Sequence, residues 1–167
     1  MKAYMTNGTV DFLAKIADDH PELTFFIMTG PSSTLVYYED NQKSIFAAGR
    51  EYEILLNKGN IQEEGFVVMN HIPIADEGKP VFEQGFQRRQ HAVESMPGFH
   101  AYRLLKPLKG NTYVVLTQWA REKDYNAWKN SEEFSKAHQA SSVKQPAYFL
   151  EQPFASTYSM YDPEKED

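Results

Sequence analysis

The order of extended and helical segments in the second half of the chain is the feature that most constrains the fold. The run at residues 66–74, which has a continuous apolar start, precedes a helical stripe at 79–95, and two extended runs at 99–108 and 112–120 flank the turn KGN. A further helical segment and a last extended run complete the order β-α-β-β-α-β. This order is that of the ferredoxin-like split βαβ unit, whose two helices cover one face of an antiparallel sheet.

The first half repeats most of this order without visible sequence identity. An extended run at residues 2–8 precedes a helical stripe at 9–21, and aromatic and β-branched runs within 23–40 predict a hairpin across PSS. Residues 50–59 are predicted as a short helix that a glycine closes. We therefore predict an α+β, ferredoxin-like fold of the dimeric α/β-barrel type, in which two tandem β-α-β-β-α units form a pseudo-dimer within one chain.

The two predicted units also give the domain boundaries. Residues 1–62 would form an N-terminal ferredoxin-like half, and residues 63–162 a complete C-terminal unit. Residues 163–167 form a polar tail, which we expect to be frayed.

Charge and composition exclude several classes of partner and site. The formal net charge is −6 and the basic residues are scattered, which argues against a nucleic-acid surface or an anionic membrane as partner. The chain has no cysteine, so disulfides, thiolate metal sites and cysteine nucleophiles are excluded. The start lacks the apolar core of a signal peptide, and no run approaches the roughly 18 to 20 apolar residues of a spanning helix. We expect a cytoplasmic protein whose partner is a small ligand or another protein.

A tryptophan and a histidine lie ten residues apart in the last helical segment, on either side of a polar break. On one uninterrupted helix, Trp128 and His138 would be separated by about 15 Å of rise and would face directions about 80° apart. Asn130 or Ser131 would be a good N-cap, and Asn130 with Glu133 has the spacing of a capping box, so we expect the helix to stop and restart there. In the second piece Phe134 and His138 share a face, which places the imidazole beside an apolar surface.

Asn70 is the unusual residue of the apolar strand, because a buried amide needs hydrogen-bond partners or costs about 1–3 kcal/mol. The other histidines show no HxxxH or HExxH spacing, and no P-loop, nucleophile-elbow or dinucleotide fingerprint is present. A lone histidine near an apolar face and a helical tryptophan are more often packed residues than ligands. From the residues alone, that interpretation and an axial ligand to an iron held in a porphyrin both stay open.

Three segments carry a resemblance to a known family: residues 66–89, 96–120 and 128–138. They resemble the haem-degrading monooxygenases of the IsdG type, built on the antibiotic-biosynthesis-monooxygenase domain. With YMTNGTVDFL near its start, the chain most resembles the longer HmoB-type members from Gram-positive bacteria. The resemblance covers nearly the whole chain and is strongest over about residues 65 to 140. Its specific part is an asparagine early in a strand combined with the pattern W…S..F..AH.

The resemblance implies a role for individual residues. The catalytic asparagine of the family corresponds to Asn70, its tryptophan to Trp128, and its axial haem-iron ligand to His138. The asparagine would hydrogen-bond near the oxygen species, and the tryptophan would press the porphyrin out of plane. Phe86 is expected to line the haem pocket, with Gln87 as the alternative.

The implied function is oxidative opening of the porphyrin with release of iron, with haem as both substrate and oxygen-activating cofactor. An external electron donor, a reductase, would be the protein partner. Residues 63–162 would carry the site, and one haem would bind per chain because the first half lacks the W…S..F..AH pattern. The shorter relatives are homodimers of single units, so we expect a pseudo-dimeric monomer, with a homodimer as the alternative. Two other functions stay open: a haem-binding or signalling module without turnover, and a cofactor-independent monooxygenase of an aromatic metabolite.

Overall fold

The computed structural model describes residues 1–89, 93–131 and 149–165. Eight strands make up the sheet of this described chain: β1 (Lys2–Asn7), β2 (Phe26–Thr29), β3 (Thr34–Asp40), β4 (Arg50–Gly59), β5 (Phe66–Pro73), β6 (Phe99–Pro107), β7 (Thr112–Trp119) and β8 (Phe154–Met160). The described α-helices are α1 (Val10–Asp19), α2 (Lys79–Arg89) and α3 (Glu122–Lys129). Short 3-10 turns lie at Asp76–Gly78, Val93–Ser95 and Pro163–Lys165.

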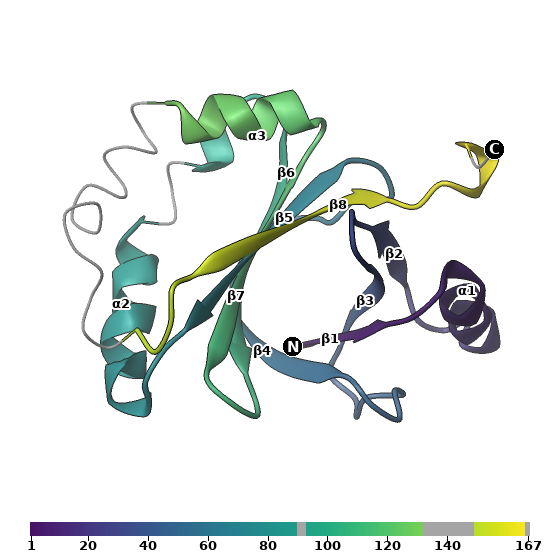
Figure 1. The fold of residues 1–167 in the computed structure, drawn as a ribbon, viewed down its shortest axis with the longest axis horizontal. Helices are drawn as coiled ribbons and strands as arrows, with labels where there is room; N and C mark the ends of the chain where they lie inside the picture. Colours follow the sequence, from purple (N-terminus) through teal and green to yellow (C-terminus); the bar gives the residue numbers. More distant parts are fainter. Residues whose placement is uncertain (90–92, 132–148, 166–167) are drawn as a thin grey trace.

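The strands close into a barrel with the order β1-β3-β2-β8-β5-β7-β6-β4, and neighbouring strands are antiparallel (Figure 1). Within the second half the order is β8-β5-β7-β6, which is fourth, first, third, second along the chain. The first half has the same order, β4-β1-β3-β2. The predicted ferredoxin-like α+β fold is confirmed, and its sheet is part of a closed eight-stranded barrel.

The predicted helix at residues 50–59 is wrong, because this segment is strand β4. Its glutamates, leucines and lysine favour a helix locally, yet the segment pairs with β1 on one side and with β6 on the other. A bulge after Ile54 lets this side chain pack in the barrel, while Leu55 and Leu56 pack on the outside. Pairing on both sides satisfies the backbone and closes the barrel, so tertiary context outweighs helix propensity. The first half is therefore β-α-β-β-β.

Two apolar cores lie on the two faces of the sheet. The barrel core fills the inside: Ala3, Met5, Met28, Leu35, Tyr37, Tyr52, Val67, Met69, Leu105, Val114, Leu116 and Tyr158. The outer core lies between the second half of the sheet and α2 and α3: Ile72, Ile74, Phe82, Val93, Tyr102, Leu104, Tyr113, Val115, Trp119 and Trp128. Neighbouring residues of β5 and β7 alternate between the two cores, as the pleat of a strand requires.

The helix ends follow the local sequence. The Thr9 side chain accepts a hydrogen bond from the Phe12 amide and begins α1. The α3 helix ends at Lys129, where the Ser131 hydroxyl donates to the Trp128 carbonyl at 2.6 Å. The predicted stop at residues 130–131 is confirmed, whereas the predicted restart lies outside the described residues. Within the described chain, none of the helices has the length and apolar character needed to cross a membrane.

Candidate functional site

Asn70 lies in the centre of β5, on the sheet face that looks toward α2 and α3. Its cross-strand neighbours are Val115 of β7 and Ala155 of β8. Val115 belongs to the outer core, as does Ile72 two positions along β5, so the Asn70 side chain shares their face. The amide is half-buried and has no hydrogen-bond partner within the part of the chain that the structure describes.

The α3 helix covers one end of this face through Trp128. This indole is 7% exposed and stacks on Trp119 of β7, with ring centroids 6.4 Å apart and planes inclined by 27°. Trp119 is fully buried, and its Nε1 donates to the Thr117 hydroxyl at 3.0 Å. Its cross-strand neighbour is Phe66, which lies four residues before Asn70 on β5. At about 3.3 Å per residue, the contact of α3 lies roughly 13 Å from Asn70 along the strand.

The α2 helix covers the other end through Phe82 and Phe86. The Phe82 ring lies 4.7 Å from that of Tyr113 and 4.9 Å from that of Phe86. Tyr113 is opposite Ile72, two residues beyond Asn70. Figure 1 shows α2 and α3 on the same side of the barrel, and Asn70 therefore lies along β5 between their contacts.

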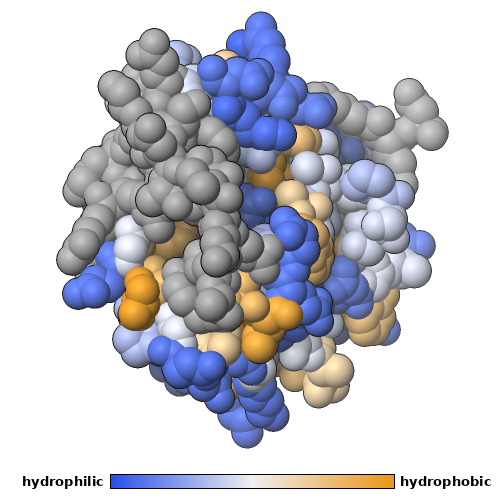
Figure 2. Space-filling model, turned by 60° about the vertical axis from the view of Figure 1, so that its left-hand side comes forward, coloured by the Kyte–Doolittle hydropathy of each residue, from blue (hydrophilic) through white to orange (hydrophobic). Residues whose placement is uncertain are grey.

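A charged pair closes the α2 end of the site. The Tyr113 hydroxyl donates to the Glu83 carboxylate, and Lys106 Nζ lies 3.0 Å from the same carboxylate oxygen. Burial, followed by the hydrogen bond to Glu83 and its charge, raises the pKa of the Tyr113 hydroxyl, which therefore stays protonated as the donor. Figure 2 shows this side of the molecule, where apolar side chains are exposed among hydrophilic ones; Val81 of α2 is 59% exposed.

The structure brings three of the sequence-predicted site residues to one face: Asn70, Phe86 and Trp128. His138 lies outside the described residues, and Gln87, the alternative to Phe86, lies on α2. The sequence analysis missed Trp119, the buried ring behind Trp128. The alternation along β7 could have indicated it: Tyr113, Val115 and Trp119 are separated by two and four positions and all belong to the outer core.

The side chains of this face would suit a large flat molecule with an apolar rim and a polar centre. An unpartnered amide stands between aromatic rings contributed by two helices, and few polar groups among many apolar ones are typical of cofactor-sized sites. Among residues 1–89, 93–131 and 149–165, no group of three or more His, Asp or Glu side chains could hold a metal ion. The apolar and aromatic residues of this face would suit a porphyrin, which brings its own iron.

Residues 65–140 match the model of the antibiotic biosynthesis monooxygenase family. These residues, a little under half of the chain, resemble that family. The matched segment begins one residue before β5 and spans Asn70, Phe86, Trp128 and His138.

The relatives of this chain carry two kinds of name. A heme-degrading monooxygenase of Listeria monocytogenes is 28% identical over 130 residues, 78% of each chain. The signal transduction protein TRAP of Staphylococcus epidermidis is 26% identical over 145 residues, 87% of each chain. The solved structure of a major regulator of staphylococcal pathogenesis matches with a TM-score of 0.87 at 24% identity, covering 97% of this chain and 100% of that chain. This last likeness concerns the fold alone. The predicted resemblance to the haem-degrading members of the family is confirmed.

Proposed function

We propose that this protein is a haem-degrading monooxygenase whose site lies between the outer face of β5 and the helices α2 and α3. The observation that carries the proposal is the half-buried Asn70 amide, which has no partner in the described chain and faces an aromatic surface. A relative named as a heme-degrading monooxygenase, 28% identical over 78% of this chain, supports it.

Each proposed residue would have a distinct physical role. His138 would supply a neutral imidazole as the axial ligand of the haem iron. Asn70 would direct its amide at the reacting centre, where it can donate from Nδ2 and accept at Oδ1. Trp128 is backed by the buried Trp119 ring, so a porphyrin pressed against it would bend before the indole gives way. Phe86 would line the pocket wall from α2.

Haem is the substrate of the proposed reaction and supplies its own oxygen-activating iron. Opening the ring oxidatively would consume O2 as the source of the inserted oxygen, together with electrons that an external donor such as a reductase would deliver. The part of the protein is to bind the porphyrin, orient it and keep it bent, so binding energy from the apolar contacts would be used to strain the ring.

We further propose that the chain is a pseudo-dimer with one haem site. Its units would be residues 1–62 and residues 63–162, followed by the tail 163–167. The shared strand order of the two halves supports this division. The described link between β3 and β4, residues 41–49, contains no helix, so the first half has no counterpart of α3 to carry a second Trp128.

A second function is favoured by the relatives named TRAP: haem binding without turnover, as a signalling module. The two functions differ in what happens to bound haem. The test is an absorbance time course of the purified protein with one equivalent of haem, in air, with ascorbate as reductant and catalase present. For the proposed monooxygenase, a Soret band forms and then decays while iron is released.

Three variants localise the reaction. Asn70→Ala should keep the Soret band and slow its decay about tenfold or more, the size expected when one hydrogen bond to a charged centre is lost. Trp128→Phe should also bind haem and turn over more slowly, whereas His138→Ala should weaken the Soret band itself. Asn7→Ala is the matched control, because Asn7 is an exposed strand amide of β1.

The outcomes separate the two functions. A wild-type Soret band that persists in reductant would favour the signalling module. No Soret band at all would overturn both, and full turnover by all three variants would overturn this site.

A further inference from the structure

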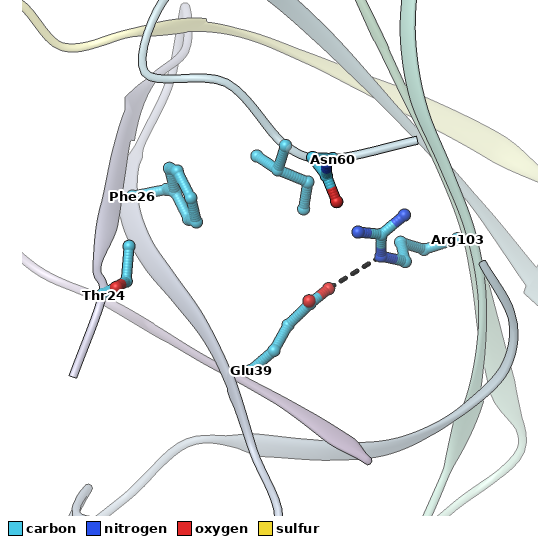
Figure 3. A pocket seen from close by; sticks show the side chains of 6 residues that line it. Thr24, Phe26, Glu39, Asn60 and Arg103 are labelled. Atoms are coloured by element: carbon cyan, nitrogen blue, oxygen red, sulfur yellow. Dashed lines mark hydrogen bonds and ion pairs between the residues drawn. The ribbon is translucent and has the colours of Figure 1, made fainter. Parts of the chain in front are cut away.

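A second candidate site lies inside the barrel, at the end where β2 begins and β4 ends. A cavity of about 220 Å³ opens there (Figure 3). Its lining combines side chains of the first half with one arginine of β6: Thr24, Phe26, Glu39, Asn60, Ile61 and Arg103.

The cavity lies on the opposite face of the sheet from the proposed haem site. Arg103 is opposite Leu116 of β7, which belongs to the barrel core. Asn70 is opposite Val115, which belongs to the outer core. Because directly opposed residues share a face, a ligand in this cavity would not touch a ligand beside Asn70.

Arg103 is held rigidly and presents one edge to the cavity. Its side chain is 6% exposed, and Nε donates to Glu39 Oε2 at 2.8 Å. Nη1 donates to the carbonyls of Lys58, Gly59 and Tyr102 at 3.0, 3.0 and 2.9 Å. Nη2 has no partner among the residues that the structure describes, and the guanidinium extends toward the space lined by Phe26 and Asn60 (Figure 3).

Glu39 offers the complementary group. Its Oε2 accepts from both Arg103 and the Tyr37 hydroxyl, the latter at 2.6 Å. Burial, reinforced by the Glu39 charge, holds the pKa of the Tyr37 hydroxyl well above its usual range, so this hydroxyl stays a donor. Oε1 has no hydrogen-bond partner in the described chain. The cavity therefore contains a free donor, Arg103 Nη2, and a free acceptor, Glu39 Oε1. The charges of the two side chains cancel.

We propose that this cavity binds a small zwitterion of amino-acid size, whose carboxylate accepts from Arg103 Nη2 and whose ammonium donates to Glu39 Oε1. A purely anionic ligand would leave Glu39 Oε1 without a donor, and a purely cationic one would leave Arg103 Nη2 without an acceptor, each at a desolvation cost. Phe26 and Ile61 form an apolar wall for an uncharged side chain. The volume is below the roughly 300–1,000 Å³ of sites for drug-sized molecules, which limits the ligand to a small metabolite.

The test uses L-leucine as the probe on the full-length protein. The Arg103 Nε–Hε signal is followed by ¹H–¹⁵N NMR during the titration and is assigned by its loss in Arg103→Lys. Leucine should shift this signal saturably below about 20 mM. The two half-ligands are 4-methylpentanoate and 3-methylbutylamine. Each should bind at least about tenfold more weakly than leucine, because each lacks one charged hydrogen bond.

A matched pair of variants tests the location. Thr24 is exposed at the cavity, so Thr24→Trp should fill the opening and abolish the shift without removing the ion pair. Ser32→Trp adds the same ring at an exposed turn that does not line the cavity and should leave binding unchanged. The proposal is overturned by the absence of a saturable shift in the wild type, by equal binding to Thr24→Trp, or by a half-ligand that binds as well as leucine.

Discussion

His71 is next to Asn70 on β5 but faces the other side of the sheet, where its ring stacks on Phe154 at 4.6 Å and 10°. Its Nε2 is buried and has no hydrogen-bond partner in the described part of the chain. Burial lowers the pKa of the His71 imidazole, and the charge of Arg50 lowers it further. The folded protein therefore holds this ring neutral in a place where a proton would be costly.

This histidine gives a pH dependence with a definite sign. Because the folded-state pKa lies below the ordinary value of 6.5, the unfolded chain takes up the proton first as pH falls. The stability that the neutral His71 ring contributes is therefore fully present above pH 6.5 and is lost as pH falls through the folded-state pKa. His71→Gln should flatten the fall in unfolding free energy between about pH 7 and pH 5, measured by urea unfolding. An unchanged slope in His71→Gln would show that the acid sensitivity arises elsewhere.

Among the secondary-structure elements, the hydrophobic pattern of the sequence predicts those strands that have one apolar and one polar face, or two apolar faces. The runs that became β5, β6 and β7 were recognisable because β-branched and aromatic residues dominate them. β4 was not, because its partners on both sides are distant in sequence and only their pairing makes it a strand. The same limit applies to sites. Asn70 could be predicted from its own strand, whereas the Arg103–Glu39 pair joins residues 64 positions apart and has no local signal.

The position of α3 depends on a glycine at the turn before β6. Gly98 has φ +81°, and a Cβ there would overlap the Asp124 carboxylate in the first turn of α3. The Ala120 amide also donates to the Gly98 carbonyl at 2.7 Å. Gly98→Ala should destabilise the protein by about 2 kcal/mol or more and shift α3, which carries Trp128. Urea unfolding and a Soret titration measure the two effects.

Gly110 provides the matched control for this prediction. Its φ is +87°, yet among the described residues no atom beyond its own chain neighbours lies within 4 Å of the Cβ position. Gly110→Ala therefore carries the backbone strain alone, about 1 kcal/mol, and should leave the haem spectrum unchanged. Equal costs for the two substitutions would show that the contact with Asp124 does not position α3.

At the scale of the whole molecule, barrel closure removes the free edges of both halves. The two halves of the sheet meet along β4 and β6 from Tyr52 to Gly59. They also meet at β2 and β8, through the pairs Met28–Met160 and Thr29–Ser159. Each strand of the barrel has a neighbour on both sides, although β2 and β8 pair through only two residues each, so little strand edge is left to add a second copy. The barrel core draws residues from both halves, so each half completes the apolar interior of the other.

This closure predicts a monomer that binds one haem. Light scattering should give a mass near 19.2 kDa at all concentrations, because the surface that a single unit would bury against a partner is already buried within the chain. A Soret titration should reach its end point at one haem per chain, and His138→Ala should remove that end point, since the first half lacks the helix that carries Trp128. A dimeric mass together with one haem per chain would favour the homodimer. Two equivalents of haem, or an end point that survives in His138→Ala, would place a second site in the first half and contradict the proposed asymmetry of the two units.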